Sequence, residues 1–165
     1  MVVVWGSGFN GCCPADGSSP VKPESFGLCG GSFVIILCHG HFDLLHPGHF
    51  KHLKAAKDLG GVLIVSITAG RWMTKPGHPL YTDEERVLML RELRCVDSVY
   101  ICDDPGPYRA IDDINPDLYV KGVEYKGKLP EFQYCVERGI GVRFLGEKIY
   151  GSTRIALQSG LLQST

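Results

Sequence analysis

The chain has 165 residues, and its 17 basic residues nearly balance its 18 acidic ones, giving a formal net charge of -1. This length and a hydrophobic fraction of 44% fit one compact domain with a substantial core, and they leave no room for a second catalytic domain. The neutral balance argues against a general nucleic-acid-binding protein, which usually carries a clear basic excess. Any anionic ligand must therefore be held by a local site.

No segment has the composition of a membrane anchor. The longest apolar runs, residues 33–38 and 62–67, are far shorter than the roughly 20 residues that cross a bilayer. Residues 1–5 are apolar but lack the basic leading region and long hydrophobic stretch of a secretory signal. The seven cysteines show no Cys-x-x-Cys spacing, and we expect them to be reduced, several of them in the core. We therefore expect a cytoplasmic protein without a membrane partner.

The first predicted segment, residues 1–31, is rich in Gly, Ser, Pro and Cys and has no lasting periodicity. We interpret it as a poorly ordered extension without a role in the chemistry. The folded domain is then expected to occupy residues 32–165.

Strands and helices alternate from this point onward. Continuously apolar runs predict buried strands at 33–38 and 62–68, and further strand patterns lie at 98–102, 118–121 and 142–145. Helical patterns at 48–58, 83–93, 107–114 and 130–138 separate them, the second opening with the capping-box spacing of Thr82 and Glu85. The alternation predicts an α/β fold, a Rossmann-like doubly wound sheet of about five parallel strands with helices on both faces. Ligands of such sheets bind beyond the carboxyl ends of the strands.

The strongest chemical signal lies where the first of these strands turns into the first helix. There the sequence reads His39-Gly40-His41-Phe42-Asp43-Leu44-Leu45-His46-Pro47-Gly48-His49. Gly40 lets a phosphate approach the backbone, and His46 and His49 can donate hydrogen bonds to phosphate oxygens from the start of a helix. Gly48 keeps the gap between the two imidazoles open.

From Gly40 to His49 this segment resembles the G-x-F-D-x-x-H-x-G-H signature of the cytidylyltransferase-like nucleotidyltransferase superfamily. The resemblance implies an enzyme that joins a nucleoside triphosphate to a phosphorylated small molecule and releases pyrophosphate. His46 and His49 would then be catalytic, since their N–H groups stabilise charge on the α-phosphate without a covalent intermediate. The nucleotide site would also include His39, Gly40, His41, Phe42 and Gly48.

Zinc binding is an alternative, because five histidines crowd residues 39–52 and imidazole is a common zinc ligand. It leaves Gly40, Phe42 and Gly48 unexplained, so we predict no metal site built from protein ligands. We expect His52 to be an ordinary histidine on the helix surface. Asp43 either holds the loop through backbone amides or orients a histidine, and we favour the first role.

A second motif, residues 116–125, ends the fourth predicted strand. It resembles the P-D-x-x-V-K-G-x-D-Y segment of bacterial heptose-phosphate adenylyltransferase domains, with Glu124 in place of the usual Asp. The resemblance implies that Lys121 projects into the crevice as a catalytic point charge for phosphate. Gly122 and Glu124 would line the nucleotide site.

Two further segments match the family in order along the chain. Residues 150–155 resemble its closing S-[ST]-x-x-I motif, in which Ser152 and Thr153 would cap a last helix and bind the β- and γ-phosphates. Some relatives carry an arginine just before this motif, and here Lys148 or Arg154 would have to replace it. Residues 71–86 resemble a basic loop in which Lys75 would close over the triphosphate. Arg86 would either reach the same phosphates or pair with carboxylates on its own helix.

Taken together, the motifs favour ATP and a sugar 1-phosphate such as heptose 1-phosphate as substrates. Mg2+ would arrive with the nucleotide, because no dense set of carboxylates is present. The alternative enzyme is a CTP-dependent cytidylyltransferase for glycerol 3-phosphate or a phosphorylated amino alcohol, since residues 125–128 resemble its W-E-G-K stretch. An archaeal-type FAD synthetase matches less well at Lys121. A catalytically inactive nucleotide-binding module remains the alternative of another class, and the resemblance implies a homodimer.

Overall fold

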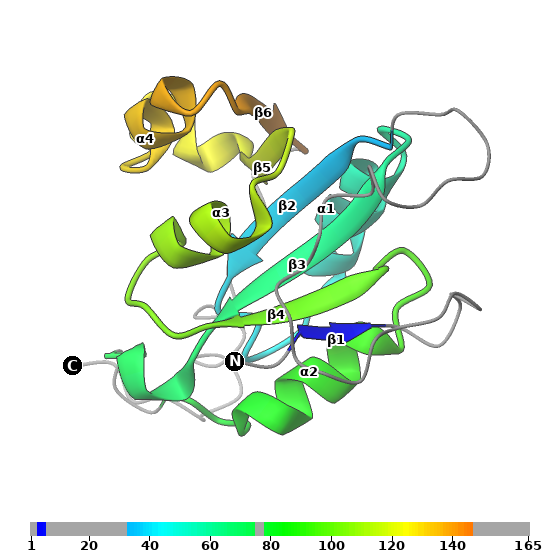
Figure 1. Ribbon diagram of the computed structural model, residues 1–165. Coiled ribbons are helices and arrows are strands. Elements are labelled where there is room, and N and C mark those ends of the chain that lie inside the picture. The colour runs from blue at the N-terminus through cyan, green and yellow to red at the C-terminus, as the bar shows by residue number, and fades with distance from the viewer. Residues whose placement is uncertain (1–2, 6–32, 75–77, 147–165) are drawn as a thin grey trace.

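A six-stranded sheet forms the centre of the computed structural model, which describes residues 3–5, 33–74 and 78–146 (Figure 1). Its strands lie in the order β1-β4-β3-β2-β5-β6. All neighbours are parallel except β1, which pairs antiparallel with β4 at the edge. The strands are β1 (Val3–Trp5), β2 (Ile35–Gly40), β3 (Val62–Thr68), β4 (Ser98–Cys102), β5 (Leu118–Gly122) and β6 (Gly141–Leu145).

Helices cover both faces of the sheet, and each face has its own core. The helices are α1 (Pro47–Lys57), α2 (Asp83–Arg91), α3 (Tyr108–Ile114) and α4 (Phe132–Glu137), with short 3-10 turns η2 (Gly70–Trp72) and η3 (Val123–Tyr125). Leu53 of α1 and Leu90 of α2 share one buried cluster with Val65. Ile111 of α3 and Cys135 of α4 belong to the other. The predicted doubly wound α/β fold with five parallel strands is therefore confirmed.

The β2–β5 pair is the point where the strand order reverses. From β2 the chain builds outward through β3 and β4, and it then returns to add β5 and β6 on the opposite side. The register places Cys38 opposite Val120, so the ends of β2 and β5 lie side by side. Ligands of open α/β sheets bind in the crevice beyond such a reversal. The fold thus brings the first and second sequence motifs to the same edge.

The helix starts follow the local sequence signals. At α2, Thr82 Oγ1 accepts a hydrogen bond from the Glu85 amide at 3.2 Å, and the Glu85 side chain accepts one from the Thr82 amide at 2.8 Å. This confirms the predicted capping box, which satisfies two otherwise unpaired amides. At α1, Pro47 occupies the first helical position, where its missing N–H costs nothing.

Within the N-terminal segment, only residues 3–5 are described. Residues 3–5 form β1 and pair with residues 98–100 of β4. The edge of β4 has unpaired main-chain groups that can pair with a short extended segment, even one without a recognisable strand pattern in its sequence. Residues 6–32 and the predicted last helix, within 147–165, lie outside the described residues.

The described cysteines are unpaired, and three of them, Cys38, Cys102 and Cys135, are buried as predicted. Burial raises the pKa of Cys38 to about 12, so this thiol behaves as an apolar core group. Among the described residues, no helix has the length and apolar character to cross a membrane.

The core that supports the crevice is testable by matched substitutions. Leu53→Ala removes a fully buried side chain from beneath β2 and should lower the free energy of unfolding by about 2–5 kcal/mol. Leu88→Ala on α2 removes a side chain that is 60% exposed and should change it by less than about 0.5 kcal/mol. Urea denaturation of both variants measures the difference. Equal effects would contradict the packing described for α1.

Candidate active site

The loop between β2 and α1 is shaped by Gly40 and Phe42. Phe42 adopts a left-handed backbone conformation with φ of 47°, and its ring is buried. A Cβ on Gly40 would lie 3.0 Å from that ring. The same ring lies 5.0 Å from the ring of His49, centroid to centroid. Gly40 therefore permits a close turn that sets Phe42 beneath the second motif histidine.

His46 and His49 stand together at the start of α1. Their rings stack at a centroid distance of 3.9 Å and an interplanar angle of 28°. His46 is the N-cap residue, and its Nδ1 accepts a hydrogen bond from the Gly48 amide at 3.1 Å. Since Nδ1 is an acceptor, the neutral ring carries its proton on Nε2, which is the nitrogen available to donate to a ligand. The local sequence thus selects the tautomer.

Both imidazoles are held neutral at physiological pH. Burial, followed by the neighbouring His46 and His52 rings, lowers the pKa of His49 to about 4. Burial also lowers the pKa of His46. The Nδ1 atom of His49 is buried and has no hydrogen-bond partner. The pair can therefore act as neutral N–H donors. In this form they can hydrogen-bond a negative charge that develops on a ligand oxygen.

Lys121 closes the crevice from the β5 side. Its Nζ donates to the main-chain carbonyl of His39 at 3.0 Å, which joins the ends of β5 and β2. The ammonium lies 5.0 Å from the ring centroid of Tyr125 in η3. Its side chain is largely buried, and the carboxylate of Glu131 lies 3.5 Å from Nζ.

Gly122 and Glu124 form the turn after Lys121. A Cβ on Gly122 would lie 2.3 Å from the carboxylate oxygens of Glu124, so the turn needs glycine for this approach. Glu124 Oε2 is buried without a hydrogen-bond partner. The carboxylate lies near enough to His52 of α1 to raise the pKa of that imidazole, although burial lowers it more.

The His39 side chain is hydrogen-bonded to the neighbouring strand β3. The His39 ring is held between Ser66 and Thr68 of β3, with Nδ1 at 3.0 Å and Nε2 at 3.2 Å from their hydroxyls. Burial keeps the pKa of His39 well below its ordinary value. Both ring nitrogens are therefore engaged with the neighbouring strand, and the main-chain carbonyl of His39 accepts the hydrogen bond from Lys121.

Arg86 is completely buried and braces the loops from behind. Its guanidinium donates to the carbonyl oxygens of His41 at 2.7 Å and Thr68 at 2.9 Å, and to Asp83 at 2.6 Å. Of the two expected roles, the structure shows pairing with a carboxylate on its own helix. The sequence could not reveal the two carbonyl partners, because they come from other elements.

Asp43 ties the first motif to the segment before α2. Its carboxylate accepts hydrogen bonds from the amides of Leu80 at 2.9 Å and Tyr81 at 3.1 Å, and from His78. Burial alone would raise the pKa of Asp43, but these hydrogen bonds hold it below its usual range. The predicted role of Asp43 in holding backbone amides is thus confirmed, although the amides belong to another loop. The alternative role, contact with a histidine, is present as well, through His78.

The expectation that His52 lies on the exposed surface of the helix is wrong. Its Nδ1 atom is buried without a hydrogen-bond partner, and burial lowers its pKa. A position one turn after His49 places it on the same side of α1, toward η3. Lys75, Ser152 and Thr153 lie outside the described residues. Within the described part, no three histidine, cysteine or acidic side chains gather in a way that could hold a metal ion.

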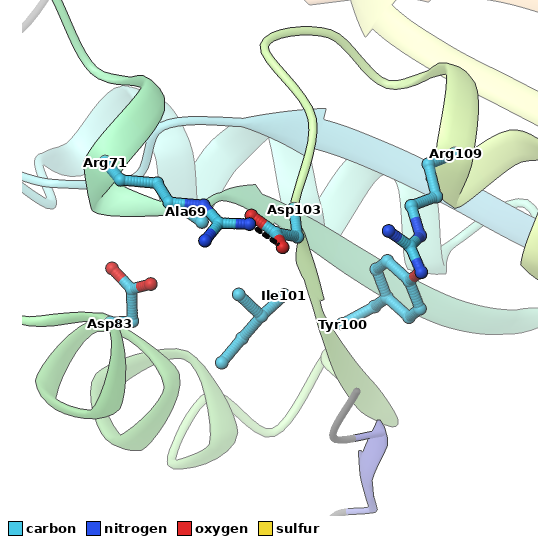
Figure 2. A pocket seen from close by; sticks show the side chains of 7 residues that line it. All are labelled: Ala69, Arg71, Asp83, Tyr100, Ile101, Asp103 and Arg109. Carbon is cyan, nitrogen blue, oxygen red and sulfur yellow. Dashed lines mark hydrogen bonds and ion pairs between the residues drawn. The ribbon is translucent and has the colours of Figure 1, made fainter.

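A hollow of about 350 Å³ lies beyond the ends of β3 and β4. Figure 2 shows Arg71 paired with Asp103, with Arg109 beside Tyr100. Asp103 also accepts a hydrogen bond from the Trp72 indole at 3.0 Å. The hydrogen bonds from Arg71 and then Trp72 lower the pKa of Asp103. Sequence reasoning missed Asp103 and Arg109, which belong to no recognised motif.

The structure thus brings the stacked histidines at the start of α1 and a buried lysine on β5 to the point where the strand order reverses. Residues 37–143 match the model of the family described as Cytidylyltransferase-like. The chain belongs to this family and is accordingly a nucleotidyltransferase.

Curated relatives match the same region. The chain is 40% identical over 97 residues to the Bifunctional protein HldE of Sulfurimonas denitrificans, covering 57% of this chain and 20% of that protein. It is 40% identical over 113 residues to the Bifunctional protein HldE of Streptomyces coelicolor, covering 64% and 24%. The chain thus spans about a fifth to a quarter of the length of these relatives.

Among solved structures, a lipopolysaccharide core biosynthesis protein from Thermoplasma volcanium is similar, with a TM-score of 0.58 and 25% sequence identity. The match covers 72% of this chain and 98% of that one. It supports the same α/β fold for this chain.

The neutral state of His49 can be measured directly. Histidine ring protons followed by NMR against pH, with His49 assigned through a His49→Gln variant, should show its inflection near 4. Because this lies below the unfolded value of about 6.5, the unfolded chain takes up the proton first as the pH falls. His49 should therefore contribute to a loss of folding stability between about pH 6.5 and 4. An inflection near 6.5 would contradict the buried setting.

Proposed function

We propose that the chain transfers a nucleotidyl group from ATP to a sugar 1-phosphate of the heptose 1-phosphate type, giving a nucleotide-activated sugar and pyrophosphate. The observation that carries the proposal is the convergence of the His46–His49 pair and Lys121 at the β2–β5 crevice. Supporting it, the second motif at Lys121 resembles heptose-phosphate adenylyltransferase domains, and relatives named HldE match this region.

In the proposed reaction, a phosphate oxygen of the acceptor attacks the α-phosphorus in line. One P–O bond forms there as the bond to the β-phosphate oxygen breaks, and pyrophosphate leaves with the electron pair. The neutral N–H groups of His46 and His49 would donate to oxygens on which charge develops. Lys121 would attract the same anionic group as a buried cation. Catalysis by these residues is then positioning and electrostatic stabilisation.

Magnesium is proposed to accompany the nucleotide and to screen the triphosphate charge. The described residues offer no set of three ligands for it, so phosphate oxygens and water would hold most of its coordination sphere. Lys75, Ser152 and Thr153 stay predicted contacts of the triphosphate. A homodimer in the cytoplasm is the proposed state of the protein.

The hollow beside β4 is proposed to receive the acceptor. Its volume of about 350 Å³ falls within the usual range for small-molecule sites. Arg71 and Arg109 carry the cationic groups that would bind a phosphate there (Figure 2). Arg71 pairs with Asp103, and Asp83 pairs with Arg86, so a bound sugar phosphate would exchange partners with these carboxylates. The mixture of both charges suits a polyhydroxylated phosphate better than a simple apolar ligand.

The proposal is tested by pyrophosphate release in the presence of magnesium. ATP and CTP are each paired with heptose 1-phosphate, glycerol 3-phosphate and phosphocholine. Release with ATP and the heptose phosphate is the expected result. Release only with CTP and an alcohol phosphate would replace it with the cytidylyltransferase alternative. Nucleotide binding without release from any pair would contradict the proposal and favour a binding module.

The two histidines of α1 provide a matched comparison. His49→Ala should lower kcat by about two or more orders of magnitude while the melting temperature shows that the fold persists, because a donor to the transition state is lost. His52→Ala, one turn further along the helix, should lower kcat less than about tenfold. Steady-state pyrophosphate release measures both variants, and an unchanged kcat in His49→Ala would remove His49 from the mechanism.

A further inference from the structure

Glu131 is a buried carboxylate that belongs to none of the sequence motifs. It precedes α4 as its N-cap residue and is only 5% exposed. Its Oε1 accepts a hydrogen bond from the Tyr119 hydroxyl at 2.7 Å. Burying an ionised carboxylate is costly unless it is paired and hydrogen-bonded, so this placement calls for a cationic partner.

That partner is Lys121. Its Nζ lies 3.5 Å from Oε1 of Glu131, and both side chains are buried, at 12% and 6% exposure. Tyr119 and Lys121 project from the same face of β5, two residues apart, and Glu131 meets both from the N-cap position of α4. The ammonium therefore has two fixed anchors, the Glu131 carboxylate on one element and the His39 carbonyl on another.

Other groups around the ammonium cannot replace Glu131. From β2, Cys38 and His39 face it, and burial leaves both uncharged, since it raises the pKa of the thiol and lowers that of the imidazole. From α1, the pKa of His52 is also lowered by burial. From η3 come the Tyr125 ring and Glu124, whose influence on Lys121 is smaller than that of Glu131. Glu131 is the dominant compensating charge.

Burial pushes the pKa of Lys121 downward, and Glu131 acts first among the groups that push it back up. A lysine that loses its proton can no longer attract phosphate as a cation. We propose that Glu131 is a positioning residue that fixes the Lys121 side chain at the mouth of the crevice and keeps its ammonium charged for phosphate binding. This rests on the proposed phosphate-binding role of Lys121.

The direct test is an NMR titration of lysine side chains labelled with 13C at Cε, in which the Lys121→Arg variant identifies the Lys121 signal. In Glu131→Gln, which keeps an oxygen for the Tyr119 hydroxyl, the pKa of Lys121 should fall by about one unit or more. The matched control is Glu137→Gln on the same helix, where the carboxylate is exposed and accepts a hydrogen bond from the Gln133 side chain. It should leave the Lys121 pKa unchanged.

The second readout is the pH profile of kcat/KM for pyrophosphate release. Glu131→Gln should move the alkaline limb to lower pH by the same interval as the NMR shift, and Glu137→Gln should not move it. Glu131→Asp retains the charge and should recover most of the wild-type profile. A purely structural role would lower activity evenly across the pH range.

An unchanged Lys121 pKa in Glu131→Gln would overturn the proposal, as would equal shifts in the Glu131 and Glu137 variants. Should Glu131→Gln fail to fold, Glu131→Asp carries the same test, because it withdraws the carboxylate by one methylene group and a smaller fall in the Lys121 pKa is expected. The titration needs no substrate, so failure of the proposed reaction is distinguishable from failure of the Glu131–Lys121 coupling.

Discussion

The parallel pairing of β5 against β2 is the constraint on which the site depends. It aligns Cys38 with Val120, so that the first motif leaves β2 beside the point where Lys121 leaves β5. The hydrogen bond from Lys121 to the His39 carbonyl fastens these two ends together. Without that pairing, the histidines of α1 and the lysine would be separated by more than seventy residues of chain with no reason to meet. The strand reversal therefore brings the motif histidines and a buried lysine to one edge of the sheet.

Behind the site, two buried charged side chains hydrogen-bond to main-chain groups of the loops. Arg86 binds the carbonyls of His41 and Thr68, and Asp43 binds the amides before α2. Each is a buried charge with several hydrogen bonds, which is the condition under which such groups are tolerated. The consequence is a rigid rear wall, so that the neutral His46 and His49 at the front need little reorganisation to meet a developing charge.

Most of the fold could be predicted from the sequence, because each of the five parallel strands and four helices carries a local signal of apolar runs, periodicity or capping. The motif histidines and Lys121 were found because they stand at strand ends in a recognisable order. The engagement of His39 by Ser66 and Thr68, the two carbonyl partners of Arg86, and the Glu131–Lys121 pair could not be found in this way. These contacts join elements distant in sequence, and only the packing of the sheet and its helices determines them. The pairing of β1 with β4 is likewise a contact between segments far apart in the sequence.

The most direct measurement of the central claim is a crystal structure with magnesium and a non-hydrolysable ATP analogue. The account predicts the triphosphate in the β2–β5 crevice, with phosphate oxygens within hydrogen-bonding distance of His46 Nε2, the His49 ring and Lys121 Nζ. A triphosphate bound instead among Arg71, Arg109 and Asp103, with the two histidines and Lys121 making no contact, would contradict it.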